Sequence, residues 1–181
     1  MLLTQHPFVS KVVSGGQTGV DRAALDVALA HGIPCGGWCP KGRKAEDGIL
    51  DARYPLRDTP IDDYAQRTTW NVRDSDGTLI LTRSALIPRQ SSGPLGEESR
   101  GRSRGTGGTA QTVEDAKQLG KPHLGVDLNR PLPVEAVRGW IHTNRIRVLN
   151  VAGPRESKDP GIYAATSGFL RGLLRASSPH S

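Results

Sequence analysis

The sequence predicts an α/β domain of the Rossmann-like, doubly wound type, with a mostly parallel sheet and helices on both faces. Two observations lead to this prediction. Short apolar runs typical of buried strands alternate with helical segments along the chain, and glycine-rich turns follow three of these runs. Such alternation is typical of parallel sheets whose crossovers are helices. A length of 181 residues suits one compact domain, so we expect a single domain over residues 1–181.

The first half of the chain provides the expected β-α-β start. Residues 11–13 form a short apolar run that leads into a glycine turn, and the next segment places Val20, Ala24, Val27 and Ala28 on one helical face. Gly32-Ile33-Pro34 ends that helix. The expected elements are a strand at 11–13, a helix at 17–31, a strand at 35–38, an ordered polar loop at 41–60, a helix at 66–74 and a strand at 78–82.

Residues 84–104 interrupt this pattern, because they are rich in Ser, Gly, Arg and Pro and show almost no periodicity. Such a segment buries too little apolar surface to offset its ordering entropy, so we expect a flexible insertion there and a disordered tail at 176–181. Between them we expect helices at 109–119, 134–142 and 160–174 and strands at 122–128 and 147–152. Ile162, Ala165, Phe169 and Leu173 predict the buried stripe of the last helix.

Composition limits the function classes. The net charge of +6 favours an anionic partner, and a small nucleotide would satisfy it as well as DNA would. Aromatic residues make up only 4% of the chain, which speaks against a single-stranded nucleic-acid platform. Two cysteines, Cys35 and Cys39, cannot complete a zinc site, so we expect reduced thiols and no metal. The first ten residues lack the pattern of a signal peptide and no run is long enough to span a membrane, so we expect a cytoplasmic protein.

Three turns carry the expected chemistry, because each follows a strand and precedes a helix. Their glycines allow backbone N–H groups to approach an anion, and the helix N-terminus adds positive potential. Glycine turns also serve simple chain reversal, but three at the same sheet edge favour a ligand site. The residues expected to bind ligand there are Ser14, Gly15, Gly16, Gln17, Thr18, Gly19, Gly107, Gly108, Thr109, Gly153 and Arg155.

Four charged residues extend this prediction, each with an alternative. Asp21 and Arg22 lie in the first turn of the helix after the glycine turn. Either both contact the ligand, or Asp21 only complements the helix dipole while Arg22 is solvated. Lys41 and Arg43 follow the second strand, where they meet a phosphate or remain solvated. The neighbouring carboxylates, Glu46 and Asp47, could hold a metal or orient Lys41 and Arg43.

Standard motifs are absent from the sequence. The turn fails both G-x-G-x-x-G and the P-loop pattern. The five histidines are scattered, and none adjoins a glycine turn. The catalytic residues are therefore unknown from the sequence.

Three segments, SGGQTGVDRAALD at 14–26, PKGRKAEDG at 40–48 and NVRDSDGTLI at 71–80, resemble the "putative molybdenum carrier" family. GGT at 107–109 and AGPRES at 152–157 continue the resemblance, which runs from Lys11 to Leu174 and is interrupted only by the insertion. This family is also described as circularly permuted YpsA-like members of the Rossmann-type superfamily that includes the lysine-decarboxylase-like proteins.

The resemblance implies a Rossmann-like fold, self-association into a homo-oligomer and a phosphorylated nucleotide-like ligand, with molybdenum cofactor as the carrier hypothesis. Phosphoribohydrolase relatives carry a catalytic glutamate in P-G-G-x-G-T-x-x-E, but Thr112 stands in its place here. Glu114 comes two residues later, and two helical residues rotate by about 200°, so Glu114 should face away from that position.

Three function hypotheses follow. The first is a binding or carrier protein for a phosphorylated nucleotide-like ligand. The second is a nucleoside-monophosphate N-glycosidase, which the missing glutamate disfavours. The third is single-stranded nucleic-acid binding, which the few aromatic residues disfavour, so we expect a small-molecule partner and neither nucleic acid nor membrane.

Overall fold

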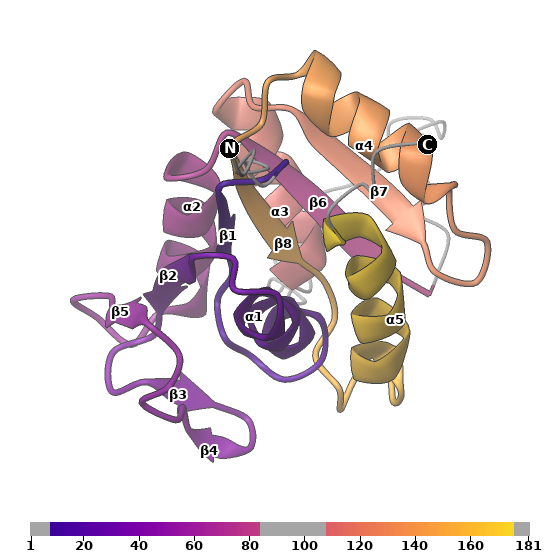
Figure 1. Ribbon diagram of the computed structural model, residues 1–181. Coiled ribbons are helices and arrows are strands. Elements are labelled where there is room, and N and C mark those ends of the chain that lie inside the picture. The colour runs from indigo at the N-terminus through magenta and orange to yellow at the C-terminus, as the bar shows by residue number, and fades with distance from the viewer. Residues whose placement is uncertain (1–7, 84–107, 176–181) are drawn as a thin grey trace, which may run out of the picture.

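The computed structural model describes residues 8–83 and 108–175 (Figure 1). Within them, six strands form one sheet in the order β5-β2-β1-β8-β6-β7. All neighbouring strands pair in parallel, so their carboxyl ends lie along one edge. This is the Rossmann-like α/β fold that the sequence predicts. The strands are β1 Lys11–Val13, β2 Cys35–Cys39, β5 Leu56–Asp58, β6 Gly77–Thr82, β7 His123–Asp127 and β8 Val148–Ala152.

Helices cover both faces of the sheet, as expected for a doubly wound fold. α1 (Val20–Ala30), α4 (Val134–Thr143) and α5 (Ile162–Leu174) lie on one face, where α5 packs against the other two (Figure 1). α2 (Tyr64–Arg73) and α3 (Gly108–Gln118) pack together on the opposite face. The chain changes face after β5, which leads into α2, and it returns to the first face with α4 after β7.

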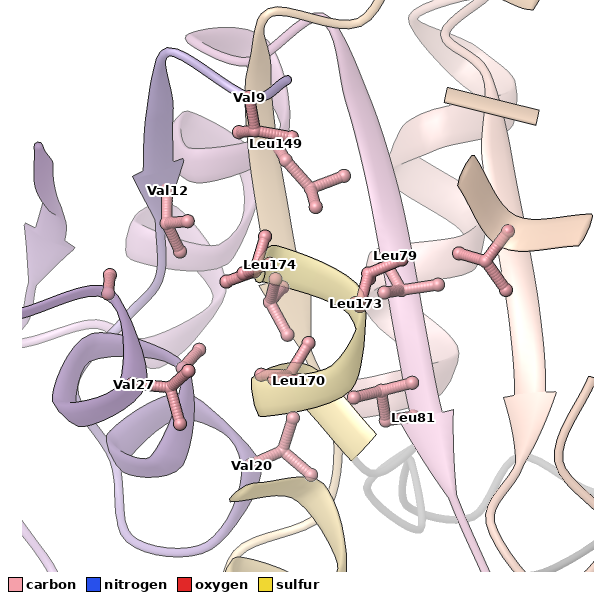
Figure 2. Close-up of a cluster of buried hydrophobic side chains, with 14 of the residues drawn as sticks. Val9, Val12, Val20, Val27, Leu79, Leu81, Leu149, Leu170, Leu173 and Leu174 are labelled. Carbon is pink, nitrogen blue, oxygen red and sulfur yellow. The ribbon is translucent and has the colours of Figure 1, made fainter. Parts of the chain in front are cut away.

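The main core lies between the sheet and the face formed by α1, α4 and α5. Figure 2 shows Leu170 and Leu173 of α5 close to Leu79 and Leu81 of β6, and all four side chains are fully buried. All six residues of β6 are buried, so this strand lies at the centre of the hydrophobic layer. The predicted face of α1 is confirmed, because Val20, Ala24, Val27 and Ala28 are all buried.

The predicted loop at 41–60 is partly wrong. It contains a small hairpin, β3 (Lys44–Ala45) paired with β4 (Gly48–Ile49), followed by β5 at the edge of the main sheet. β5 is three residues long and buries only Leu56, so its sequence has no alternation that could reveal a strand. We call residues 41–55 the arm.

The predicted stripe of α5 is also wrong in part. Ala165 and Phe169 are only partly buried, whereas the fully buried positions include Thr166 and Leu170 beside Ile162 and Leu173. The buried face is therefore rotated from the predicted one, and it includes a polar residue, Thr166, which hydrophobic periodicity could not reveal. The helix begins after Gly161, whose φ of 91° is left-handed, so Pro160 precedes the first turn. The insertion predicted at 84–104 and the tail at 176–181 lie outside the described residues.

Gly153 fixes how closely β8, β6 and α1 approach one another. A Cβ atom at this position would overlap the carbonyl oxygen of Leu81 and lie 2.6 Å from Cγ2 of Val20. The first of these neighbours is backbone of the central strand, which cannot move away cheaply. Gly153 therefore has a packing role, whatever it contributes to ligand binding.

We expect Gly153→Ala to lower the free energy of unfolding by about 2 kcal/mol, in the range seen for overpacked cores. The matched control is Gly139→Ala in α4, where a Cβ would meet no atom within 4 Å; it should raise stability by up to about 1 kcal/mol, because alanine favours helix. Urea denaturation followed by circular dichroism measures both. Equal stability of Gly153→Ala and the wild type would contradict the packing role.

Candidate functional site

The turns that follow β1 and β8 lie against each other at the carboxyl edge of the sheet. The backbone N–H of Val20 donates to the carbonyl of Pro154 at 3.2 Å, and the N–H of Glu156 donates to Oγ1 of Thr18 at 3.1 Å. β6 is the other neighbour of β8, and α3 begins with Gly108 and Thr109 after the described part of β6 ends. Gly107 lies outside the described residues.

The glycines of the first turn are needed for close packing. A Cβ on Gly15 would lie 2.6 Å from Cζ of Arg67, and one on Gly19 would lie 2.5 Å from the carbonyl oxygen of Pro154. Gly16 and Gly19 have φ of 76° and 74°, the left-handed region that favours glycine. Ser14 donates to the carbonyl of Val151 at 2.8 Å. The turn is therefore a buried junction between elements.

Several backbone N–H groups at the start of α1 are already hydrogen-bonded within the protein. Besides the bond from Val20 to Pro154, the N–H of Arg22 donates to the carbonyl of Gln17 at 2.9 Å. Oε1 of Gln17 accepts from the N–H of Thr18 and from the N–H of Glu46, at 3.0 and 2.9 Å. These bonds occupy amides that were predicted to be available to an anion.

A buried ion pair joins this turn to α2. Nη1 of Arg67 lies 2.8 Å from Oδ2 of Asp21, and their side chains are only 14% and 4% exposed. Burial raises the pKa of Asp21, and the attraction of Arg67 and the N–H of Gln17 oppose that effect without cancelling it. Nε of Arg67 is buried and has no hydrogen-bond partner among the described residues. Arg67 was not predicted from the sequence, although it lies four residues before Asn71, which places both on one side of α2.

A small polar cavity of about 10 Å³ adjoins this ion pair. It lies between the Gly15 turn, α2, α3 and the end of β8, and its volume is close to that of one water molecule. Thr112 is 2% exposed and donates to the carbonyl of Gly108. Asn71 is 2% exposed and pairs with the backbone N–H and C=O of Trp38. The polar or charged side chains lining the cavity are Asp21, Arg67, Thr68, Asn71, Thr112 and Asn150.

The orientation predicted for α3 is confirmed. Thr112 is buried at the cavity, whereas Glu114 is exposed and accepts a bond from Gln118 on the same helix. The position that carries a glutamate in the phosphoribohydrolase pattern is therefore occupied by a threonine that lines the cavity.

The structure brings only some of the predicted cations to the turn. Arg22 donates to the carbonyl of Gly16 and pairs with both oxygens of Asp47 at 3.0 Å. Arg43 instead donates to four backbone carbonyls of the arm and of β5, at residues 50, 51, 54 and 56. Lys41 is exposed. Arg43 therefore holds the arm together, and its guanidinium is not directed at the glycine turn.

Glu46 of the arm connects the two turns. It accepts hydrogen bonds from Thr18 and from the N–H and hydroxyl of Ser157, and it lies 3.8 Å from Arg155. Partial burial opposes ionisation, but the bonds from Ser157 and Thr18 and the charge of Arg155 outweigh it and lower the pKa of Glu46. Arg155 also packs over the ring of Tyr64, 5.8 Å from its centroid. Glu46 therefore anchors the arm and does not orient Lys41 or Arg43.

A separate groove of about 410 Å³ runs along the outer side of α1. The hydroxyls of Tyr54 and Tyr163 donate to the two oxygens of Asp26, both at 2.8 Å. Burial raises the pKa of both tyrosines, and the bond to Asp26 adds to it. Arg53 lies 3.6 Å from Asp26. Three residues predicted to bind ligand, Thr18, Gly19 and Arg22, line this groove, whereas its other lining residues, from α1, the arm, and the end of the chain after β8, were not predicted.

Among residues 8–83 and 108–175, no group of three or more His, Cys, Asp or Glu is arranged to hold a metal ion. Cys35 and Cys39 are free thiols. Burial, with Asp58 beside it, raises the pKa of Cys39 to about 11, so this thiol is not ionised near neutral pH. In the same described ranges, no helix is both long and apolar enough to cross a membrane.

We expect Glu46→Gln to lower stability by about 1 kcal/mol at neutral pH, because the carboxylate accepts charge-assisted hydrogen bonds at a partly exposed site. The folded-state pKa of Glu46 lies below its ordinary value, so its contribution is present above that ordinary value and is lost as pH falls through the folded pKa. The stability difference between wild type and Glu46→Gln should therefore stay constant from neutral pH down to the ordinary pKa of glutamate and shrink as the pH falls below it. Urea titrations at several pH values measure it, and a difference that stays constant below that pKa as well would refute the anchoring role.

Comparison with known proteins identifies the family of this chain. The model of the circularly permutated YpsA SLOG family matches residues 12–174. A crystal structure of a "putative molybdenum carrier protein" from Syntrophus aciditrophicus SB is 44% identical, with a TM-score of 0.79 over 93% of this chain and 97% of that chain. No curated protein matches the chain. The chain therefore belongs to the circularly permutated YpsA SLOG family.

Proposed function

We propose that this protein is a carrier that binds a phosphorylated, nucleotide-like molecule, with the phosphate at Arg67. The observation that carries the proposal is the position of this guanidinium. It lies over Gly15, beside the polar cavity, with a buried Nε–H that has no partner among the described residues. A guanidinium has five donors in a fixed fork, which suits the oxygens of a phosphate.

The place of Arg67 in the fold supports this proposal. In open α/β sheets, ligands bind beyond the carboxyl ends of the strands, where successive connections leave on opposite faces. β8 leads to α5 on one face and its neighbour β6 leads to α3 on the other, so the connections change face between these two adjacent strands. The cavity lies at the ends of β1 and β8, and Thr112 places α3 beside it.

Charge favours the cavity over the groove as the place that receives an oxygen atom of an anion, since the cavity has about the volume of one water molecule. The groove is lined by three carboxylates, Asp26, Asp47 and Glu156, against two arginines. Both arginines are already paired with carboxylates, Arg22 with Asp47 and Arg53 with Asp26. An anion in the groove would therefore meet repulsion, whereas the cavity is lined by one arginine, one aspartate and uncharged polar groups.

Molybdenum cofactor is one candidate cargo, since the similar crystal structure is named a putative molybdenum carrier protein. The described residues offer no cluster of metal-ligating side chains. We therefore propose that such a cargo is recognised through its phosphate, not through a cluster of protein ligands to molybdenum.

Catalysis is not part of the proposal. The buried position that faces the cavity from α3 is Thr112, and a threonine hydroxyl cannot act as the general acid or base that a carboxylate provides. The remaining carboxylate at the cavity, Asp21, is engaged by Arg67. The geometry therefore favours binding over hydrolysis.

We expect Thr112→Val to weaken binding of a nucleoside monophosphate about tenfold, because the Thr112 hydroxyl, which donates to the carbonyl of Gly108 in the ligand-free protein, would turn to donate to a phosphate oxygen at the cavity. The matched control is Glu114→Gln, two residues along α3 on its exposed side, which should bind like the wild type. Isothermal titration with adenosine monophosphate, inorganic phosphate and molybdate measures these affinities.

Two outcomes would count against the proposal. Absence of binding of all three probes to the wild type would exclude a phosphate site in the protein. Equal weakening by Thr112→Val and Glu114→Gln would show that the effect does not come from the cavity.

A further inference from the structure

We propose that Asp21 takes up a proton when an anion binds at Arg67, so that the site binds an oxyanion together with a proton. This inference rests on the proposed function. In it, the protonation state of Asp21 determines how much negative charge the site can bind. The carboxylate of Asp21 gains H⁺ from solvent, while the guanidinium of Arg67 stays protonated throughout.

The charge balance around Asp21 leads to this inference. Asp21 and Arg67 form a neutral pair that is almost wholly buried. Apart from Arg67, the groups that act on Asp21 are uncharged, the N–H of Gln17 and the hydroxyl of Ser14. The other polar side chains that line the cavity, from α2, α3 and β8, are uncharged as well. No described cavity-lining side chain besides Arg67 is therefore a cation that could offset a second negative charge.

An anion at Arg67 would turn the neutral pair into a buried set with excess negative charge. An uncompensated charge in a buried site is costly, and ionisable groups there usually change protonation state instead. Arginine cannot release or gain a proton in this range. Asp21 can gain one, and its pKa is already raised by burial in the ligand-free protein.

The geometry allows Arg67 to hydrogen-bond Asp21 and a bound anion at the same time. Nη1 is engaged by Asp21 at 2.8 Å, while Nε is buried and has no partner among the described residues. A guanidinium can therefore keep the first bond and offer its other donors to the anion. Asp21 would then lie close to the bound anion, where a like charge raises a carboxylate pKa further.

Sulfate is the suitable probe, because its own charge does not change near neutral pH and any proton must go to the protein. Calorimetric titration of the whole wild-type chain in two buffers with different ionisation enthalpies counts the protons. We expect uptake of about one proton per sulfate, with the affinity falling about tenfold for each unit of rising pH above the pKa of Asp21 in the free protein. Binding without proton uptake, and with an affinity independent of pH, would overturn this inference and leave the proposed function intact.

Asp21→Asn provides the second arm, because the amide has the shape of the protonated carboxyl. This variant should bind sulfate at least about tenfold more tightly at pH values where the wild type is ionised, and without proton uptake. The matched control is Asp115→Asn on α3, a buried carboxylate 5% exposed that bonds to Thr69 and Gln111 outside the cavity lining.

The control variant should retain the proton uptake of the wild type. If Asp21→Asn does not fold, the proton count of the wild type still decides the question. If neither the wild type nor Asp21→Asn binds sulfate or a phosphate ester, the proposed function itself fails.

Discussion

The buried pair of Asp21 and Arg67 is the interaction on which the carboxyl edge of this sheet depends. It connects the first turn of α1 to α2 on the opposite face of the sheet, across the end of β1. Removing either partner would leave a charge buried without compensation, which typically costs several kcal/mol. The pair in turn requires Gly15, since any side chain there would occupy the place of the guanidinium. This one ion pair therefore requires glycine at position 15, connects α1 to α2, and forms part of the wall of the cavity.

The two described glycine turns, after β1 and β8, are better explained by this close packing than as simple anion-binding turns. Gly16, Gly19 and Gly153 contact Leu56, Pro154 and Leu81 so closely that each excludes a Cβ atom. Glu46 then joins the arm to the turns after β1 and β8. Close packing brings the strand ends together and positions one guanidinium at their junction. The chemistry of the site comes from that guanidinium more than from the turn amides.

Much of the fold could be predicted because it depends on local pattern. Apolar runs and helical faces located the strands β1, β6, β7 and β8, and the faces of α1 and α3 were oriented correctly. β5 could not be found, because one buried leucine in three residues carries no period. The face of α5 was misplaced because Thr166, a polar residue, is fully buried there. Arg67 was missed for a related reason, since an arginine on a polar helix usually faces solvent, and only its partner 46 residues away explains its burial.

The central claim is that the anionic group of a ligand is held by Arg67 at the carboxyl edge of the sheet. The most direct measurement is the NMR resonance of the Arg67 Nε–H group in ¹⁵N-labelled protein, followed during titration with adenosine monophosphate. The account predicts that this resonance moves downfield with saturation, as a buried donor without a described partner gains a hydrogen bond to the phosphate. Saturable binding that leaves the Arg67 resonance unchanged and moves Arg22 or Arg53 in the groove instead would contradict it.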